Sequence, residues 1–503
     1  MASLRERLAR KPPGYQFTIG RILAIYAGLM VTLLLAALDQ TIVATALPRI
    51  VSDLGGITQY SWVFTAYMLT STVTVPLYGK LGDVYGRKYL FLIAISIFLV
   101  GSALCGLAQG MTQLVIFRAI QGVGAGGLFP LSLAVIGAIV PPRDRGRYQG
   151  LIGSVFAASS IAGPAVGGLI VDNTTWRWIF LVNLPVGGLA LAVISLTMPK
   201  RAALTEHSID WLGAGMLASG TGALLIGLVW AGHDYAWTSG HVLVAFGIAL
   251  VMLAAFAVVE RRAREPILPF DVLRNPIVSS SVACMALIGM AMFGTISYVP
   301  LFVQGVIGSS ATSSGVVLTP LVLGAVVTSF VTGQLVSRTG RYRWNVVLGP
   351  VALAAGMFLL SRMTVNTTSG EAARAMVIAG IGLGSMMQVF VLSVQNAVPR
   401  VRIGSATALT QFSRQMGATF GVTIMGAIVN HGLPAAASRN GELQVIHRLP
   451  PALRETLSNA LHPAFVAATA VAVLVWLIAL FGVKEVPLRQ SVEDVPVPSV
   501  ELR

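Results

Sequence analysis

The chain has 503 residues, of which 55% are hydrophobic and only 11% are charged, whereas soluble domains carry about 25% charged residues. One large soluble core is therefore excluded, and repeated apolar runs of roughly 20 residues predict helices that span a bilayer. The net charge of +15 does not indicate nucleic-acid binding, because the basic residues fall in short segments between the apolar runs. Their positions instead indicate which ends of the spans face the cytoplasm.

The apolar runs predict an all-α polytopic membrane protein with fourteen transmembrane helices. The predicted spans are 21–45, 58–79, 88–108, 112–139, 148–171, 177–198, 211–231, 241–260, 276–304, 313–337, 344–363, 371–397, 404–429 and 462–483. The first span is expected to be retained, because no small-residue cleavage site follows it. Cys105 and Cys284 both lie in apolar runs, so a disulfide framework is not expected.

The distribution of basic residues predicts the orientation of these spans. With the N-terminus in the cytoplasm, 25 of the 34 lysines and arginines fall on the cytoplasmic side and two, Arg118 and Arg414, fall inside spans. The seven on the outside are Arg49, Arg177, Arg362, Arg374, Arg439, Arg448 and Arg454. Because basic loops stay in the cytoplasm, both termini are predicted to be cytoplasmic.

An internal repeat predicts two halves. The segment 79–88, GKLGDVYGRK, joins the second and third spans, and the segment 333–342, GQLVSRTGRY, joins the tenth and eleventh, 254 residues later. Parallel repeats of this kind predict a substrate site between the halves. The expected parts are a cytoplasmic N-terminus (1–20), a six-helix bundle (21–198), an inserted helix pair with its flanking loops (199–275), a second six-helix bundle (276–483) with an external loop (430–461), and a cytoplasmic tail (484–503). The polar tail is expected to be disordered.

Asp39 is the one carboxylate that can be placed well inside a predicted span. Burying an ionised carboxylate in hydrocarbon costs several kcal/mol, so the side chain is expected to face a partner or a water-filled cavity. At 1.5 Å per residue, Asp39 lies roughly 13 Å and Arg118 about 9 Å from the external ends of their helices. The two can therefore form a pair that loads and releases a proton as Arg118 moves. A static ion pair, or no contact between them, remain as alternatives.

The repeated loop carries a family resemblance. Its first copy resembles the signature loop of the major facilitator superfamily, which acts as a conformational latch between the halves. The residues that match are Gly79, Asp83, Gly86, Arg87 and Lys88. In the second copy Ser337 replaces the aspartate, so the first copy is expected to carry most of the latch.

Four further segments resemble elements of that superfamily and of its fourteen-helix drug:proton antiporter family. The segment 118–124, RAIQGVG, is similar to an RxxQGxG element linked to proton transfer. The segment 163–168, GPAVGG, is similar to the end of the antiporter motif, with Ala157 and Ile161 at its earlier glycine positions. The matching antiporter residues are Gly163, Pro164, Gly167 and Gly168. The segments 38–43, LDQTIV, and 176–187, WRWIFLVNLPVG, complete the resemblance, which covers all the predicted spans.

The substrate cavity is expected on the inward faces of spans 1, 2, 4, 5, 9, 10, 12 and 13, where aromatic and methionine side chains suit bulky apolar ligands. The expected lining residues are Gln40, Trp62, Tyr67, Met68, Gln121, Tyr298, Met387, Gln388, Asn396, Gln411 and Arg414. Arg414 is expected to balance a cavity charge or to anchor backbone carbonyls. Glu371 is expected to be a solvated acid at a helix start, with a second acidic site of the cavity as the alternative.

The resemblance implies a secondary transporter that exports amphipathic drugs by alternating access, driven by the proton gradient. Its expected partners are lipophilic small molecules, protons and membrane lipid, and the expected setting is a monomer in the bacterial cytoplasmic membrane. A dedicated exporter of a lipid, siderophore or metabolite shares every motif and remains the alternative. No cofactor, metal or nucleic acid is expected, and because the GxxxxGK[ST] loop is missing, neither ATP hydrolysis nor another enzymatic activity is predicted. A membrane sensor would need a soluble signalling domain, and no segment is long enough for one.

Overall fold

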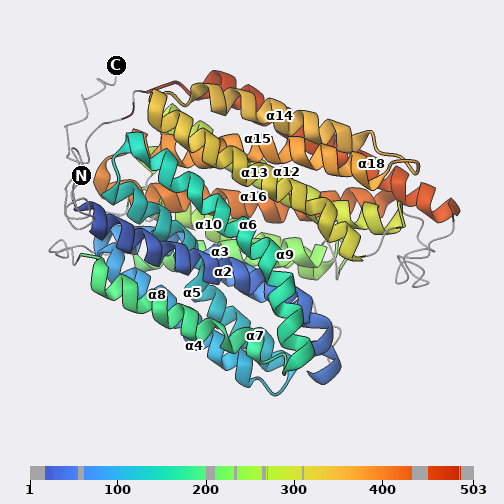
Figure 1. The fold of residues 1–503 in the computed structure, drawn as a ribbon, viewed down its shortest axis with the longest axis horizontal. Coiled ribbons are helices and arrows are strands. Elements are labelled where there is room, and N and C mark those ends of the chain that lie inside the picture. Colours follow the sequence, from blue (N-terminus) through green and yellow to red (C-terminus); the bar gives the residue numbers. More distant parts are fainter. Residues whose placement is uncertain are drawn as a thin grey trace, which may run out of the picture.

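The computed structural model describes residues 17–54, 62–199, 210–231, 235–262, 268, 270–308, 311–432, 451–486 and 488. Within these ranges the secondary structure is helical and contains no strand, and the long helices run side by side along the long axis of the molecule (Figure 1). The predicted all-α class is therefore confirmed. Most of the predicted N-terminus, most of the external loop and the end of the tail lie outside the described residues.

The helices follow the predicted spans. The first half contains α2 (Ile19–Leu54), α3 (Trp62–Val84), α4 (Arg87–Leu107), α5 (Met111–Ile139), α6 (Pro142–Asn173), α7 (Trp178–Leu181) and α8 (Asn183–Thr197). Then come α9 (Trp211–Val229), α10 (Gly240–Glu260) and the short α11 (Phe270–Leu273). The second half contains α12 (Pro276–Gly305), α13 (Ala311–Thr339), α14 (Arg343–Ser361), α15 (Ser369–Ala397), the 3₁₀ turn Arg400–Arg402, α16 (Ile403–Gly432) and α18 (Pro451–Gly482).

Eleven helices in the described ranges are long and apolar enough to cross a membrane. Each of the fourteen predicted spans falls on a helix, but α3, α6 and α16 are not among these eleven. The multi-pass architecture is thus confirmed, while the count of fourteen stays a prediction.

The largest differences from the predicted helix boundaries are three. The first helix continues through Pro48 to Leu54, because a single missing N–H is tolerated inside a long helix whose neighbours re-satisfy the backbone. The predicted span 177–198 is divided at Val182 into α7 and α8. The last helix begins at Pro451, inside the predicted external loop, and continues through the predicted final span to Gly482. Proline suits that position because the first turn needs no N–H donor.

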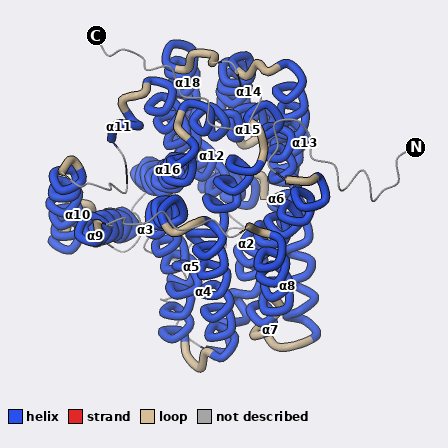
Figure 2. The backbone as a smooth tube through the Cα atoms, turned by 90° about the vertical axis from the view of Figure 1, so that its left-hand side faces the viewer, coloured by secondary structure: helices blue, strands red, loops and turns tan. Residues whose placement is uncertain are grey.

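The two halves repeat one packing pattern. In the first half the contacting pairs are α2–α6, α2–α8, α3–α5, α4–α5 and α4–α8, and in the second half they are α12–α16, α12–α18, α13–α15, α14–α15 and α14–α18. The sequence repeat therefore extends to the three-dimensional arrangement. Between the halves, α3 packs on α16 and α6 packs on α13. The inserted pair stands to one side, where α9 packs against α3 and α16 and α10 packs on α9 (Figure 2).

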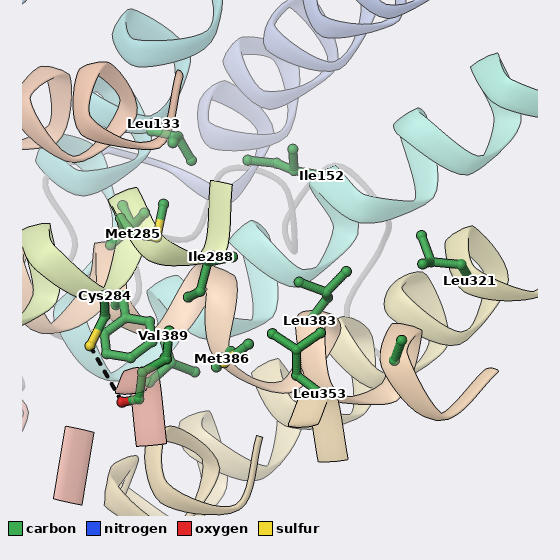
Figure 3. Packing of buried hydrophobic residues seen from close by; sticks show 14 of the residues in the cluster. Leu133, Ile152, Cys284, Met285, Ile288, Leu321, Leu353, Leu383, Met386 and Val389 are labelled. Carbon is green, nitrogen blue, oxygen red and sulfur yellow. Dashed lines mark hydrogen bonds between the residues drawn. The ribbon is translucent and has the colours of Figure 1, made fainter. Parts of the chain in front are cut away.

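A single buried apolar cluster joins the halves. Leu133 of α5 and Ile152 of α6 belong to the same cluster as Ile288 of α12 and Leu383 of α15. Figure 3 shows the first two residues facing the side chains of the second half. Because apolar burial is the main favourable term in close packing, this cluster stabilises the halves against each other in the observed arrangement.

The start of the predicted tail is fixed in place, which differs from the expected disorder. The backbone N–H of Tyr342 donates to a Glu485 oxygen at 3.2 Å, and the Tyr342 hydroxyl donates to the Lys484 carbonyl at 3.2 Å. The Val486 N–H donates to the same hydroxyl at 3.1 Å. The beginning of the tail is thus tied to the second copy of the repeated loop.

Candidate functional site

Asp39 lies at the centre of a buried polar network contributed by three helices. Its Oδ2 accepts from Arg118 Nη1 at 2.7 Å, and its Oδ1 accepts from Gln121 Nε2 at 2.8 Å and from Asn183 Nδ2 at 2.9 Å. All four side chains are at most 2% exposed. Asp39 comes from α2, Arg118 and Gln121 from α5, and Asn183 from the first turn of α8. The carboxylate therefore ties these three helices together.

Arg118 has acceptors other than Asp39. Its Nη1 also donates to Gln121 Oε1 at 2.6 Å, and its Nε donates to the Val63 carbonyl at 3.3 Å. The guanidinium carbon lies 4.2 Å from the centroid of the Tyr67 ring, within the range of a cation–π contact. Its buried Nη2 has no partner among the described residues. This guanidinium can therefore keep several contacts when the charge on the carboxylate changes.

Glycines bring the helices of the network into close contact. A Cβ on Gly101 of α4 would lie 2.5 Å from the Gln121 backbone, and one on Gly122 of α5 would lie 2.5 Å from the Tyr67 carbonyl. Any larger residue would push these helices apart. These small residues therefore set the position of the side chains that surround Asp39.

The segment similar to the antiporter motif packs on the same part of α2. A Cβ on Gly163 of α6 would lie 2.0 Å from the Thr41 hydroxyl, two residues beyond Asp39. That hydroxyl also lies 3.2 Å from the Ser159 carbonyl of α6. Gly167 is buried. Pro164 and Gly168 also lie within α6, but their burial is outside what the structure describes. Movement of α6 is thus coupled by contact to the helix that carries the buried acid.

Two polar residues of the network, Asn183 and Ser102, were missed in the sequence. Asn183 Nδ2 also donates to Ser102 Oγ at 2.9 Å, and that hydroxyl donates to the Phe180 carbonyl at 2.9 Å. The available signal was an amide inside an apolar span, within the segment 176–187 already noted for its resemblance. Buried polar groups need partners, and the buried acid Asp39 of α2 was the candidate partner for the Asn183 amide.

The end of the bundle that carries both copies of the repeated loop, here called the loop face, is where the halves are hydrogen-bonded. The Asp83 carboxylate of α3 accepts from the backbone N–H groups of Gly404 at 3.0 Å and Ser405 at 2.8 Å. These groups belong to the first turn of α16, whose dipole favours a negative charge. A Cβ on Gly404 would lie 2.3 Å from this carboxylate. The loop acid of one half thus caps a helix of the other.

Two basic residues of the first loop, Arg87 and Lys88, form hydrogen bonds within their own half. Arg87 pairs with Asp83 at 2.8 Å and donates to the Ala134 carbonyl at 3.0 Å. Lys88 donates to the Ser195 and Met198 carbonyls at 2.6 and 2.7 Å, at the end of α8. The turn between α3 and α4 needs glycine, because Gly86 has a φ of 94°.

The second copy also forms a hydrogen bond between the halves. Here the loop supplies the donor, and the acid lies on α6 of the other half. Ser337, at the position equivalent to Asp83, donates to Asp144 of α6 at 3.2 Å. A Cβ on Gly333, the equivalent of Gly79, would lie 2.1 Å from the Gly146 carbonyl. Likewise, a Cβ on Gly79 would lie 2.2 Å from that of Ala408. Both copies therefore depend on close backbone approach, and the first also places a carboxylate on helix N–H groups.

The remaining residues expected to line a cavity are spread over several places. Tyr67 packs on Arg118, and its hydroxyl hydrogen-bonds to the exposed Gln40. Gln388 lines a narrow cavity between α6, α13 and α15. Tyr298 donates to the Val422 carbonyl at 3.3 Å within the second half. The others range from buried to exposed: Trp62, Met68, Met387 and Asn396. Glu371, as expected, is exposed at a helix start, where it forms a capping box with Thr368.

Arg414 lies between the halves. Its Nε donates to Gln411 Oε1 at 3.1 Å, one turn earlier on α16. Its guanidinium carbon lies 5.8 Å from the ring centroid of Phe129 on α5. Within the described part of the chain, no carboxylate forms a salt bridge with it.

The repeated packing of two halves, each built of membrane-crossing helices, defines the fold of a polytopic transporter. The family model described as Major Facilitator Superfamily matches residues 29–422. The chain therefore belongs to the major facilitator superfamily, whose members are transporters and not enzymes.

Relatives and solved structures agree with this assignment. The chain is 38% identical over 406 residues to the multidrug transporter protein MdtP of Bacillus subtilis, covering 81% of this chain and 75% of the relative. It is 39% identical over 405 residues to multidrug resistance protein 3 of the same organism, covering 80% and 79%. The human organic anion transporter MFSD10 matches with a TM-score of 0.64 at 14% identity over 93% of this chain and 100% of that one. The proton:xylose symporter XylE matches with a TM-score of 0.62 at 14% identity over 92% and 96%. At such low identity these structures show the fold alone.

Proposed function

We propose that this protein exports lipophilic compounds and that the proton gradient drives the export through Asp39. The observation that carries the proposal is a fully buried carboxylate held by an arginine and two amides from two other helices. An ionisable group inside a membrane protein is costly and marks ion or proton pathways. The relatives named as multidrug transporters support a lipophilic cargo.

The proton would act by weakening the hydrogen bonds that join α2 to α5 and α8. While Asp39 is ionised, its two oxygens bind α5 and α8 through Arg118, Gln121 and Asn183. Protonation removes the charge that Arg118 compensates, and the arginine then relies on Gln121 Oε1 and the Val63 carbonyl. The link between α2 and its neighbours is weakened, and α6 follows through its contact at Thr41. Proton loading is thereby converted into helix movement.

The loop face is proposed to lie in the cytoplasm, as the distribution of basic residues predicts. Closure of that face by Asp83, and by the contact of Gly333 with Gly146, corresponds to a state in which cargo would be released outward. Deprotonation of Asp39 toward the cytoplasm would complete the cycle after the halves separate at the loop face. The working unit is proposed to be a monomer in the bacterial cytoplasmic membrane.

The test is gradient-driven transport of lipophilic dyes into inverted vesicles that contain Asp39→Asn. Loss of gradient-driven transport with retained dye binding is expected, because asparagine cannot carry the proton. Asp53→Asn is the matched control, since Asp53 is an exposed acid on the same helix, paired with Arg49. Size-exclusion profiles check folding, because removing one partner of a buried ion pair costs about 3–5 kcal/mol. Undiminished transport by Asp39→Asn would exclude Asp39 as the coupling residue.

A further inference from the structure

The interior of the membrane domain carries more positive than negative charge. Away from the helix ends of the described residues, Asp39 is compensated by Arg118, whereas Arg414 has no carboxylate partner. Burying an unpaired guanidinium is costly, and its described contacts are an amide oxygen and an aromatic ring. A positive charge kept there without a counter-charge is a recognition element for a negative group.

A buried hydrogen-bond donor lies beside Arg414. Gln411 is 1% exposed and uses its Oε1 to accept from Arg414, which leaves its Nε2 as a buried donor with no partner among the described residues. Arg414 itself is half-buried, so part of its guanidinium is reachable. An unfilled amide donor beside a guanidinium matches the acceptor oxygens of a carboxylate or sulfonate.

The position of this group suits a cargo held between the halves. Arg414 lies eleven residues into the 30-residue α16, near the middle of the helix, and faces Phe129 of α5 in the other half. The Phe129 ring offers an apolar surface beside the charge. A ligand bound there would contact both halves, as alternating access requires.

We infer that Arg414 and Gln411 bind the anionic group of the exported compound, so the preferred cargo is a lipophilic organic anion that bears a carboxylate or sulfonate. The inference rests on the proposed export function and names its substrate class. Along α5, Arg118 and Phe129 are eleven residues apart, or about 16 Å. At that separation the charge of Asp39 changes anion affinity only a few-fold, so coupling between proton and cargo passes through helix movement.

The test is equilibrium binding to the purified full-length chain in nanodiscs, without any proton gradient, with empty nanodiscs subtracted. The probes are 8-anilinonaphthalene-1-sulfonate and N-phenyl-1-naphthylamine, which share one aromatic framework and differ in the sulfonate. Arg414→Gln is expected to weaken binding of the sulfonate about tenfold to a hundredfold, the range for one charge-assisted hydrogen bond. Binding of the neutral probe should stay within about twofold, because the apolar surface of Phe129 is retained.

Two further variants keep the outcome decisive. Arg414→Lys keeps the positive charge but loses the planar, two-pronged donor geometry of the guanidinium, so it should retain part of the sulfonate affinity. This result is expected even where the glutamine variant is poorly folded. Arg374→Gln removes an exposed arginine on α15 and should change neither probe. An equal loss of both probes, unchanged sulfonate binding in Arg414→Gln, or no sulfonate binding by the natural chain would overturn the inference. Because no gradient is applied, failure of proton coupling would leave this result unaffected.

Discussion

Replacing Asp83 by asparagine is expected to open the loop face. In the observed state this carboxylate accepts N–H groups from Gly404 and Ser405 of the opposite half and pairs with Arg87 of its own half. Asp83 and Arg87 are four residues apart in the same half, so their pair is expected to persist when the halves separate and its energy to cancel between the closed and open states. Only the two bonds to α16 differ between those states.

The expected change in free energy between the closed and open states follows from the two bonds that Asp83 accepts from α16. A hydrogen bond to a charged group contributes about 1.5–3 kcal/mol, and a neutral one about 0.5–1.5 kcal/mol. Asparagine retains one acceptor oxygen, loses the second, and loses the favourable charge at the start of α16. The closed state should therefore lose about 3 kcal/mol relative to the open state, which shifts the equilibrium roughly a hundredfold.

Double electron–electron resonance can measure that shift. Spin labels at Tyr85→Cys and Val401→Cys, two exposed positions on opposite halves of the loop face, report their separation. Both native cysteines are buried, which limits unwanted labelling. Asp83→Asn should add a population at longer distance, whereas Glu371→Gln, an exposed acid confined to one half, should not. An unchanged distance distribution in Asp83→Asn would refute the latch role of this carboxylate.

Two further changes address the same face. Gly404→Ala should shift the distances in the same direction as Asp83→Asn, because its Cβ would lie 2.3 Å from that carboxylate; distances like those of the natural chain would contradict the close-approach argument. Ser337→Ala removes one hydrogen bond to the Asp144 carboxylate. At 3.2 Å this bond is long for a charge-assisted one, so it should contribute about 1.5 kcal/mol, the low end for a bond to a charged group. A smaller shift, about tenfold, is therefore expected with labels on α6 and α13. A shift equal to that of Asp83→Asn would mean that the second copy carries as much of the latch as the first.

The sequence predicted most of the fold because the apolar runs and the repeated loop are local signals. It also placed Asp39 and Arg118 at similar depth, since depth follows from counting residues along a helix. The helix ends were predicted less well. The first helix, α2, passes through Pro48, where the local preference of proline would end a helix. The last helix, α18, starts at Pro451 in line with the preference of proline for a first turn, although the apolar run begins later.

The partners of the key side chains could not be predicted in the same way. Asn183 reaches Asp39 from 144 residues away, after the break at Val182 between α7 and α8. Asp83 meets Gly404 across 321 residues. Such pairs depend on which helices pack together, and a single sequence carries no spacing that encodes this. The partner of the second copy of the loop could not be predicted either, because the acid that Ser337 binds, Asp144, lies on α6 and not in the repeated loop.

We propose that a proton carried by Asp39 is exchanged for the cargo. This exchange can be measured as proton flux in liposomes that contain the purified chain and an internal pH-sensitive dye, driven only by a gradient of a transported lipophilic compound. We expect the natural chain to move protons in the direction opposite to the compound, and Asp39→Asn to bind the compound but move no protons. Equal proton flux in Asp39→Asn, or transport by the natural chain with no proton movement, would contradict it.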